Sequence, residues 1–193
     1  TLAFTDAMSS LIKGFEAMVP AILILTLAWT LKSMTDSLGA AEYVSGVVAN
    51  SAAGLQQLLP AIIFIVAAFL AFATGTSWGT FGILIPICIA VFPAAEPLRI
   101  ISISACMAGA VCGDHISPIS DTTIMASAGA ECKHVHHVSS QLPYALTVAT
   151  VSFITFLVAG FTQQLGIFGS AVVSWICGIS LLAGALYVLK KKF

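Results

Sequence analysis

Residues 113–123 read Gly-Asp-His-Ile-Ser-Pro-Ile-Ser-Asp-Thr-Thr and separate two apolar runs, residues 98–112 and 124–130. This segment holds two of the chain's eight acidic residues beside four hydroxyl side chains. A charged side chain at the centre of a bilayer costs at least about 2.5–3.5 kcal/mol. Ser117 precedes a proline, which biases it away from helical conformation. We therefore interpret the segment as a break in a membrane helix whose polar side chains bind an ion.

The composition places the chain in a membrane. Its 193 residues are 59% hydrophobic and 8% charged, with a mean hydropathy of +1.06, whereas soluble domains carry about 25% charged residues. The net charge of −1 offers no basic surface to a nucleic acid, so the lipid bilayer is the expected partner. Four of the five cysteines lie in apolar runs, which favours small core residues over a disulfide framework. Thr1 is followed by no signal-peptide pattern, and we expect a fragment of a longer protein.

The long apolar runs predict an all-α membrane protein that forms a single transmembrane domain over residues 1–193. Residues 17–38 are long enough for one spanning helix, with Gly39 as its C-cap. Residues 40–54 are too mixed to span and predict a short interfacial helix. Residues 141–161 and 168–189 predict two further spans.

The distribution of basic residues predicts the orientation of these spans. Lysines occupy positions 190–192, and the positive-inside rule places them in the cytoplasm. The polar loop predicted at residues 131–140 then lies on the same side. We expect a multi-pass protein of the cytoplasmic membrane with a cytoplasmic C-terminus.

A second polar interruption, at residues 74–82, lies between apolar residues 58–73 and 83–92. At helical rise these arms measure about 24 Å and about 15 Å, shorter than the roughly 30 Å hydrocarbon core. A re-entrant hairpin therefore fits better than two spans. Non-helical backbone survives at membrane depth only where protein or water satisfies it, so the tip must face polar groups. The tip residues expected to contribute are Thr74, Gly75, Thr76, Ser77, Trp78 and Thr80.

Residues 98–130 predict a discontinuous helix, broken at Gly113 and Pro118, with a second arm from Asp121 or Thr122 to Ala130. Short, interrupted apolar segments are the best sequence indication of a secondary transporter's binding site. Helix C-termini leave carbonyls without partners and carry partial negative charge. Together with side-chain oxygens they form a ligand set that suits a hard cation such as sodium. The candidate ion- and proton-binding residues are Asp114, Asp121, Ser117, Ser120, Thr122, Thr123 and His115.

A carboxylate in such a site can couple sodium to protons. Burial disfavours its charged form, and a bound cation favours that form, so the group holds either a proton or a cation. We expect Asp114 to fill this role, with sodium bound there and at nearby hydroxyls, because it would directly follow a helix C-terminus. Asp121 is either a second ligand or an N-cap for the backbone N–H of Thr123 or Ile124. His115 is either a proton relay or a neutral hydrogen-bond partner.

Cys132, His134, His136 and His137 lie together in the predicted loop and raise the alternative of a zinc site. Their spacing lacks the second ligand pair of a structural zinc site. We therefore expect a solvated cytoplasmic loop, no transition metal and no cofactor.

The segments at residues 75–82 and 113–123 resemble the signature segments of the NhaC-type sodium/proton antiporter family, and residues 141–145 are also similar. The resemblance is close over residues 69–146. It implies ion-coupled antiport in the cytoplasmic membrane, with sodium and protons as partners. It further implies a helical transporter fold with inverted repeats, hairpins and broken helices. This chain would be the C-terminal repeat, completed by an N-terminal repeat or by a homo-oligomer partner.

Three rival functions remain open, and one of them is a non-transporting membrane scaffold, which only a natural truncation of the chain would favour. The same fold could exchange organic anions such as malate and lactate, bound at the N-termini of the second arms. Neither break contains Arg or Lys, which carboxylate recognition usually recruits. An intramembrane hydrolase would use Ser117 or Ser120 with His115, but no motif places a base beside either serine. We expect a transporter and not an enzyme.

Overall fold

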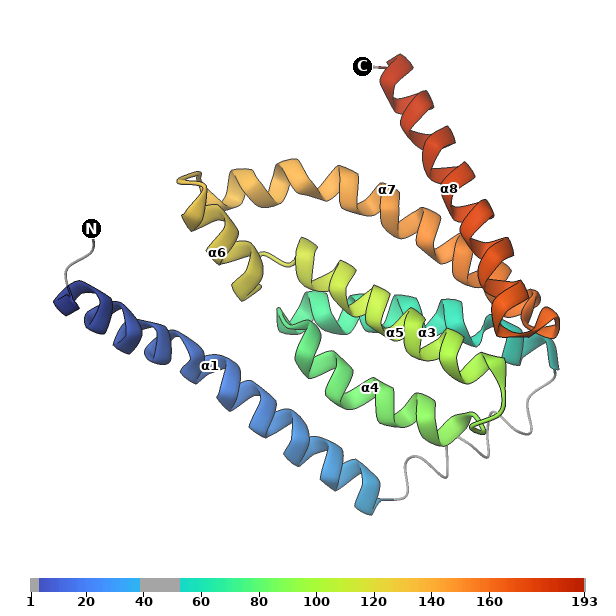
Figure 1. Ribbon diagram of the computed structural model, residues 1–193, viewed down its shortest axis with the longest axis horizontal. Coiled ribbons are helices and arrows are strands. Elements are labelled where there is room, and N and C mark those ends of the chain that lie inside the picture. Colours follow the sequence, from blue (N-terminus) through green and yellow to red (C-terminus); the bar gives the residue numbers. More distant parts are fainter. Residues whose placement is uncertain (1–3, 39–52, 193) are drawn as a thin grey trace.

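The computed structural model describes residues 4–38 and 53–192, which are helical and contain no β-strand (Figure 1). Four helices in this part of the chain are long and apolar enough to cross a membrane, which confirms the all-α membrane class. The elements are α1 (Phe4–Ser37), α3 (Ala53–Thr74), α4 (Ser77–Val91), α5 (Pro97–Ile116), α6 (Asp121–Gly129), α7 (His134–Phe161), the 3-10 helix η1 (Gln163–Leu165) and α8 (Gly166–Lys192).

The C-terminal half differs from the sequence prediction at the start of α7. This helix begins at His134, so most of the loop predicted at residues 131–140 is helical, and Pro143 lies inside the helix. The connection from α6 is only residues 130–133. Hydropathy marks the part of a helix that suits lipid, whereas the helix itself can continue into polar residues. The span predicted at residues 168–189 lies within α8.

The hairpin arms also differ in length from the prediction. Helix α3 has 22 residues, about 33 Å at helical rise, because it begins at Ala53 and not near Leu58. It is therefore long enough to span, and the predicted arm of about 24 Å was too short. Helix α4 has 15 residues, and only Gly75 and Thr76 separate it from α3. That this helical hairpin re-enters the membrane stays a prediction, as does the inverted repeat.

The N-terminal predictions are only partly covered. Helix α1 begins at Phe4, so the polar residues before the apolar run 17–38 are already helical. The crossing of a membrane by this run stays a prediction. The cap proposed at Gly39 and most of the interfacial helix proposed at residues 40–54 lie outside the described residues.

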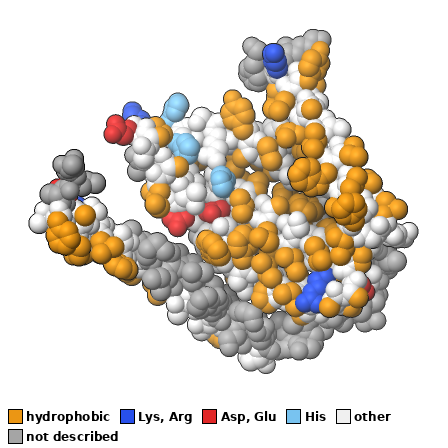
Figure 2. Space-filling view, viewed as in Figure 1, with side chains coloured by type: hydrophobic (Ala, Val, Ile, Leu, Met, Phe, Trp, Pro, Cys, Tyr) orange, Lys and Arg blue, Asp and Glu red, His pale blue; other side chains and the backbone are white. Residues whose placement is uncertain are grey.

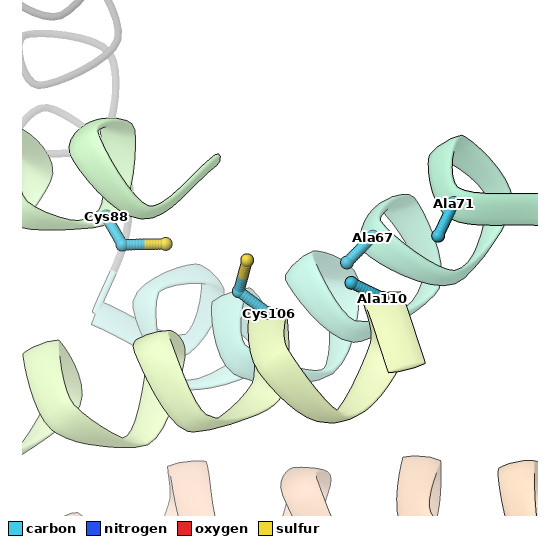
Figure 3. Close-up of a cluster of buried hydrophobic side chains, with 5 residues drawn as sticks. All are labelled: Ala67, Ala71, Cys88, Cys106 and Ala110. Atoms are coloured by element: carbon cyan, nitrogen blue, oxygen red, sulfur yellow. The ribbon is translucent and has the colours of Figure 1, made fainter. Parts of the chain in front are cut away.

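Small side chains let the central helices approach closely. Helix α3 packs more extensively against α5 than any other described pair of elements does, and α4 lies against α5 as well. A Cβ atom added to Gly109 or Gly113 of α5 would collide with a backbone carbonyl of α3. Small residues four positions apart are a common device for close contact between membrane helices. The buried cluster beside this contact consists of Ala67, Ala71, Cys88, Cys106 and Ala110 (Figure 3).

The outer surface suits lipid over much of the visible face. Hydrophobic side chains cover α5, α7 and α8, whereas acidic and histidine side chains gather over α6 and the adjoining end of α7 (Figure 2). The polar end of the molecule is therefore the end where α5 breaks and α6 and α7 begin.

Candidate functional site

The break in the polar segment is shorter than the sequence predicted. Helix α5 continues to Ile116, and only residues 117–120 are non-helical before α6 begins. The predicted break at Gly113 is wrong, because this glycine serves the close contact with the Ala68 carbonyl of α3. Asp114 consequently lies inside the last turn of α5 and not beyond its end.

Asp114 is buried and bound by a serine from across the break. Its side chain is 6% exposed, and its Oδ1 accepts a hydrogen bond of 2.6 Å from Ser120 Oγ. Hydrogen bonds to charged groups are shorter and about twice as strong as those between neutral groups. The second oxygen, Oδ2, accepts no hydrogen bond from the described residues. The carboxylate is thus held through one of its two oxygens.

The hairpin turn and the break lie against each other. Ser117 Oγ donates to the Phe72 carbonyl at 2.7 Å, in the last turn of α3. Gly75, with a φ of +68°, approaches so closely that an added Cβ would lie 2.7 Å from the Ile119 carbonyl oxygen. Only glycine combines this left-handed conformation with such an approach. The two polar interruptions of the sequence therefore lie side by side in the structure. The hairpin turn packs against the polar backbone of the break.

Ser120, and not Asp121, caps α6. Its Oγ accepts from the Thr123 N–H at 3.4 Å while its proton goes to Asp114, so one hydroxyl joins the carboxylate to the start of α6. Asp121 is exposed and accepts from its neighbour Thr122, at 2.7 Å from N–H and 3.3 Å from Oγ1. The predicted cap by Asp121 is wrong because its side chain turns to Thr122. Its role as an ion ligand, and that of the exposed Thr122, stays a prediction.

Two further candidates are bonded to the end of α5. Thr123 is buried, and its Oγ1 donates to the His115 carbonyl at 3.3 Å. The His115 side chain is exposed, and its Nδ1 lies 2.9 Å from the Val111 carbonyl of the same helix. The carbonyl accepts only, so Nδ1 donates and the ring is held along α5. No described contact joins this imidazole to Asp114.

The tip hydroxyls serve the hairpin's own backbone. Thr74 donates to the Leu70 carbonyl at 2.8 Å, and Thr80 donates to the Thr76 carbonyl at 3.1 Å. The Thr76 hydroxyl accepts from the Gly79 N–H at 3.4 Å and caps α4. Within the described residues none of these hydroxyls contacts Asp114.

The other two tip residues differ in exposure. Ser77 is buried at the start of α4, whereas Trp78 is 68% exposed. The Trp78 ring packs edge-on against Phe81 with 5.8 Å between ring centroids. This arrangement fits a packing role for Trp78.

His134 is the residue of this region that sequence reasoning missed. Its Nε2 lies 2.7 Å from the Pro118 carbonyl in the break, and its Nδ1 lies 3.1 Å from Ser127 Oγ of α6. These partners are sixteen and seven positions away, so no local spacing could have indicated them. Cys132 is exposed in the turn before α7. No group of three or more potential metal ligands occurs among the described residues.

A groove of about 630 Å³ lies between α5, α7 and α8, apart from Asp114. Its lining is apolar except for hydroxyl side chains, among them the buried Ser174, whose Oγ has no hydrogen-bond partner among the described residues. Because none of its lining residues is charged, the groove offers no ion pair to a charged substrate.

Sequence comparison identifies the family of this chain. Residues 1–161 match the model of the Na⁺/H⁺ antiporter family. The chain belongs to this family. The resemblance noted from residues 75–82 and 113–123 is thus confirmed, and the four apolar helices agree with a multi-pass membrane transporter.

Three relatives show the range of the family. An uncharacterized protein of Haemophilus influenzae is 46% identical over 95% of this chain and 34% of its own length. The malate-2H⁺/Na⁺-lactate antiporter of Bacillus subtilis is 29% identical over 82% of this chain and 34% of its own length. The arginine/ornithine antiporter ArcD of Halobacterium salinarum is 33% identical over 58% of this chain and 24% of its own length. This family member therefore spans about a third or less of the length of these curated relatives. No solved structure is similar enough to support a structural comparison.

Proposed function

We propose that this family member exchanges sodium for protons and that Asp114 binds the two in turn. The observation that carries the proposal is the burial of Asp114 at the point where the end of α5, the break and the hairpin turn meet. A buried carboxylate in a membrane helix is costly and marks a functional site by default.

The groups around Asp114 suit sodium. Ser120 Oγ is 2.6 Å from the carboxylate, and the C-terminal end of α5 adds partial negative charge. Sodium prefers such oxygen ligands, whereas the sulfur and imidazole ligands preferred by transition metals are not part of the Asp114–Ser120 pair. The proposed ligands are therefore the Asp114 carboxylate and the Ser120 hydroxyl, with Ser117 and Thr123 holding the surrounding backbone.

Competition for one carboxylate supplies the coupling. A carboxylate that binds a cation does not keep its proton, so sodium and the proton compete for Asp114. Occupancy by sodium therefore releases the proton, and protonation releases sodium. Because the site holds either sodium or a proton, opening it to each side of the membrane in turn exchanges sodium for protons.

An organic-ion exchanger of the same fold is the second candidate. Two relatives carry names of that kind, one for malate and lactate and one for arginine and ornithine. In this chain the N-terminus of α6 begins with the exposed Asp121, which would repel a carboxylate, and no cationic side chain lies in the break. Both features disfavour an organic anion such as malate or lactate, so sodium and the proton are the preferred substrates.

Paired substitutions test the role of Asp114. Sodium-driven proton movement is measured in everted vesicles that contain the protein expressed from its complete open reading frame. We expect Asp114→Asn to abolish this movement while the protein stays inserted. Asp121→Asn makes the same chemical change at an exposed position outside the proposed ligand pair, so we expect it to retain activity, and a loss of activity there would make Asp121 a second ligand. Exchange by Asp114→Asn at the wild-type rate would refute the proposal, and proton movement driven by malate without sodium would favour the organic-ion alternative.

A further inference from the structure

We propose that His134 is a positioning residue for the ion site, which holds the break in the conformation that brings Ser120 to Asp114. This inference rests on the proposed function, because it assigns His134 to the same site. It gives a role to a side chain that the sequence placed in a solvated loop.

The geometry fixes the imidazole on both of its edges. Nε2 lies 2.7 Å from the Pro118 carbonyl, and since a carbonyl only accepts, Nε2 must carry the proton and donate. On the other edge Nδ1 lies 3.1 Å from Ser127 Oγ, and the single proton of this hydroxyl can be donated either to Nδ1 or to the Ile124 carbonyl, which lies 2.8 Å from the same oxygen. The ring therefore joins the N-terminus of α7 to the break and to the body of α6.

The break needs such external support. Its residues lie outside both helices, and backbone hydrogen bonds hold it only at Ser117, whose N–H donates to the Asp114 carbonyl at 3.2 Å, and at Ser120, whose N–H donates to the Ser117 carbonyl at 3.3 Å and whose carbonyl accepts from Ile124. Ser117 is tied to the Phe72 carbonyl of α3, and Ser120 is tied to Asp114. His134 binds the carbonyl between these two serines. A shift of Pro118 would carry Ser120 with it, and hydrogen bonds weaken steeply as distance and angle leave their optimum.

His136, on the same helix, is a control supplied by the chain itself. It is exposed, and its imidazole makes no hydrogen bond within the described residues. If the loss of any imidazole at this end of α7 impaired the protein, replacing His134 and replacing His136 would have the same effect. A positioning effect would appear only at His134.

Different replacements of His134 separate positioning from simple destabilisation. Glutamine places its amide nitrogen near the position of Nε2 and can still donate to Pro118, whereas asparagine reaches only the position of Nδ1. Loss of one hydrogen bond corresponds to about threefold to tenfold in an equilibrium constant. In vesicles we therefore expect His134→Ala and His134→Asn to raise the half-saturating sodium concentration by that factor. His134→Gln and His136→Ala should stay near wild type. In all of these variants the maximal rate, divided by the amount of inserted protein, should be unchanged.

Hydrogen exchange gives a readout that does not depend on transport. In the purified protein we expect the amides of residues 117 and 119–123 to exchange faster in His134→Ala than in wild type, and His134→Gln to restore protection. Unchanged exchange and unchanged sodium dependence in His134→Ala would overturn the inference. If the wild type itself moved no protons with sodium, the proposed function would fail, and with it the assignment of His134 to a sodium site. The exchange rates would still decide whether His134 holds the break.

Discussion

At the scale of single residues, one hydroxyl connects the parts of the site. Ser120 Oγ donates to Asp114 and accepts from the Thr123 N–H. The same atom therefore fixes the carboxylate, caps α6 and is a proposed sodium ligand. By contrast, the exposed Asp121 carboxylate accepts its described hydrogen bonds only from Thr122, its neighbour in the chain.

We predict that Ser120→Ala weakens sodium binding while exchange remains detectable. Hydrogen bonds to charged groups contribute about 1.5–3 kcal/mol, so the half-saturating sodium concentration should rise by about tenfold or more. Ser120→Thr keeps the hydroxyl and should retain most of the affinity. Thr122→Ala is the neighbouring control, and an equal effect of this variant would contradict the assignment of Ser120. The measurement is the sodium dependence of proton movement in everted vesicles.

At the scale of helices, the packing of α3 on α5 sets the position of the site. Gly109 and Gly113 bring the α5 backbone against carbonyls of α3, directly before Asp114. The hairpin turn and the break then meet one helical turn further along. A change in the distance between these helices would separate Ser117 from Phe72, whose hydrogen bond measures 2.7 Å.

We predict that Gly113→Val destabilises the protein and impairs exchange without touching a proposed ligand. The added side chain would collide with the Ala68 carbonyl, and overpacking of this kind costs about 1–3 kcal/mol or more. Gly184→Val in α8 is the matched control, because nothing lies within 4 Å of a Cβ added there. Melting temperatures in detergent should fall for the first variant and change little for the second. Equal stability of the two would show that α3 and α5 do not pack in this way.

At the scale of the whole molecule, the polar end determines the predicted orientation. The turn between α6 and α7 contains Lys133 and the exposed Cys132, and α8 ends with lysines at positions 190–192. Both belong in the cytoplasm if basic residues follow the positive-inside rule.

We predict that a membrane-impermeant maleimide labels Cys132 in everted vesicles and not in intact cells. Cys88 and Cys106 are buried, and Cys112 and Cys177 are half-buried within apolar helices, so they should react little. Cys132→Ser should remove the signal and serves as the control. Labelling from outside the cell would reverse the proposed orientation.

Local chemistry along the chain was sufficient to predict several properties of this protein. Hydropathy indicated membrane helices, and the two polar interruptions indicated where helices would break, because both are properties of short consecutive segments. The resemblance to the antiporter family came from the same two segments and was confirmed. Asp114 was predicted to be buried, because the apolar runs around it left few alternatives, and it is.

Only the tertiary structure decided the partners of these residues. Ser117 bonds to a carbonyl 45 positions earlier, and His134 to one 16 positions earlier. Gly113, predicted to break a helix, allows two helices to touch, and Ser120 replaces Asp121 as the cap of α6. The sequence determines which groups must be shielded from lipid, because the free-energy cost of exposing a group to hydrocarbon depends on the chemistry of that group. Which oxygen each donor reaches depends on how distant helices pack, and that distance is set by contacts that no local pattern contains.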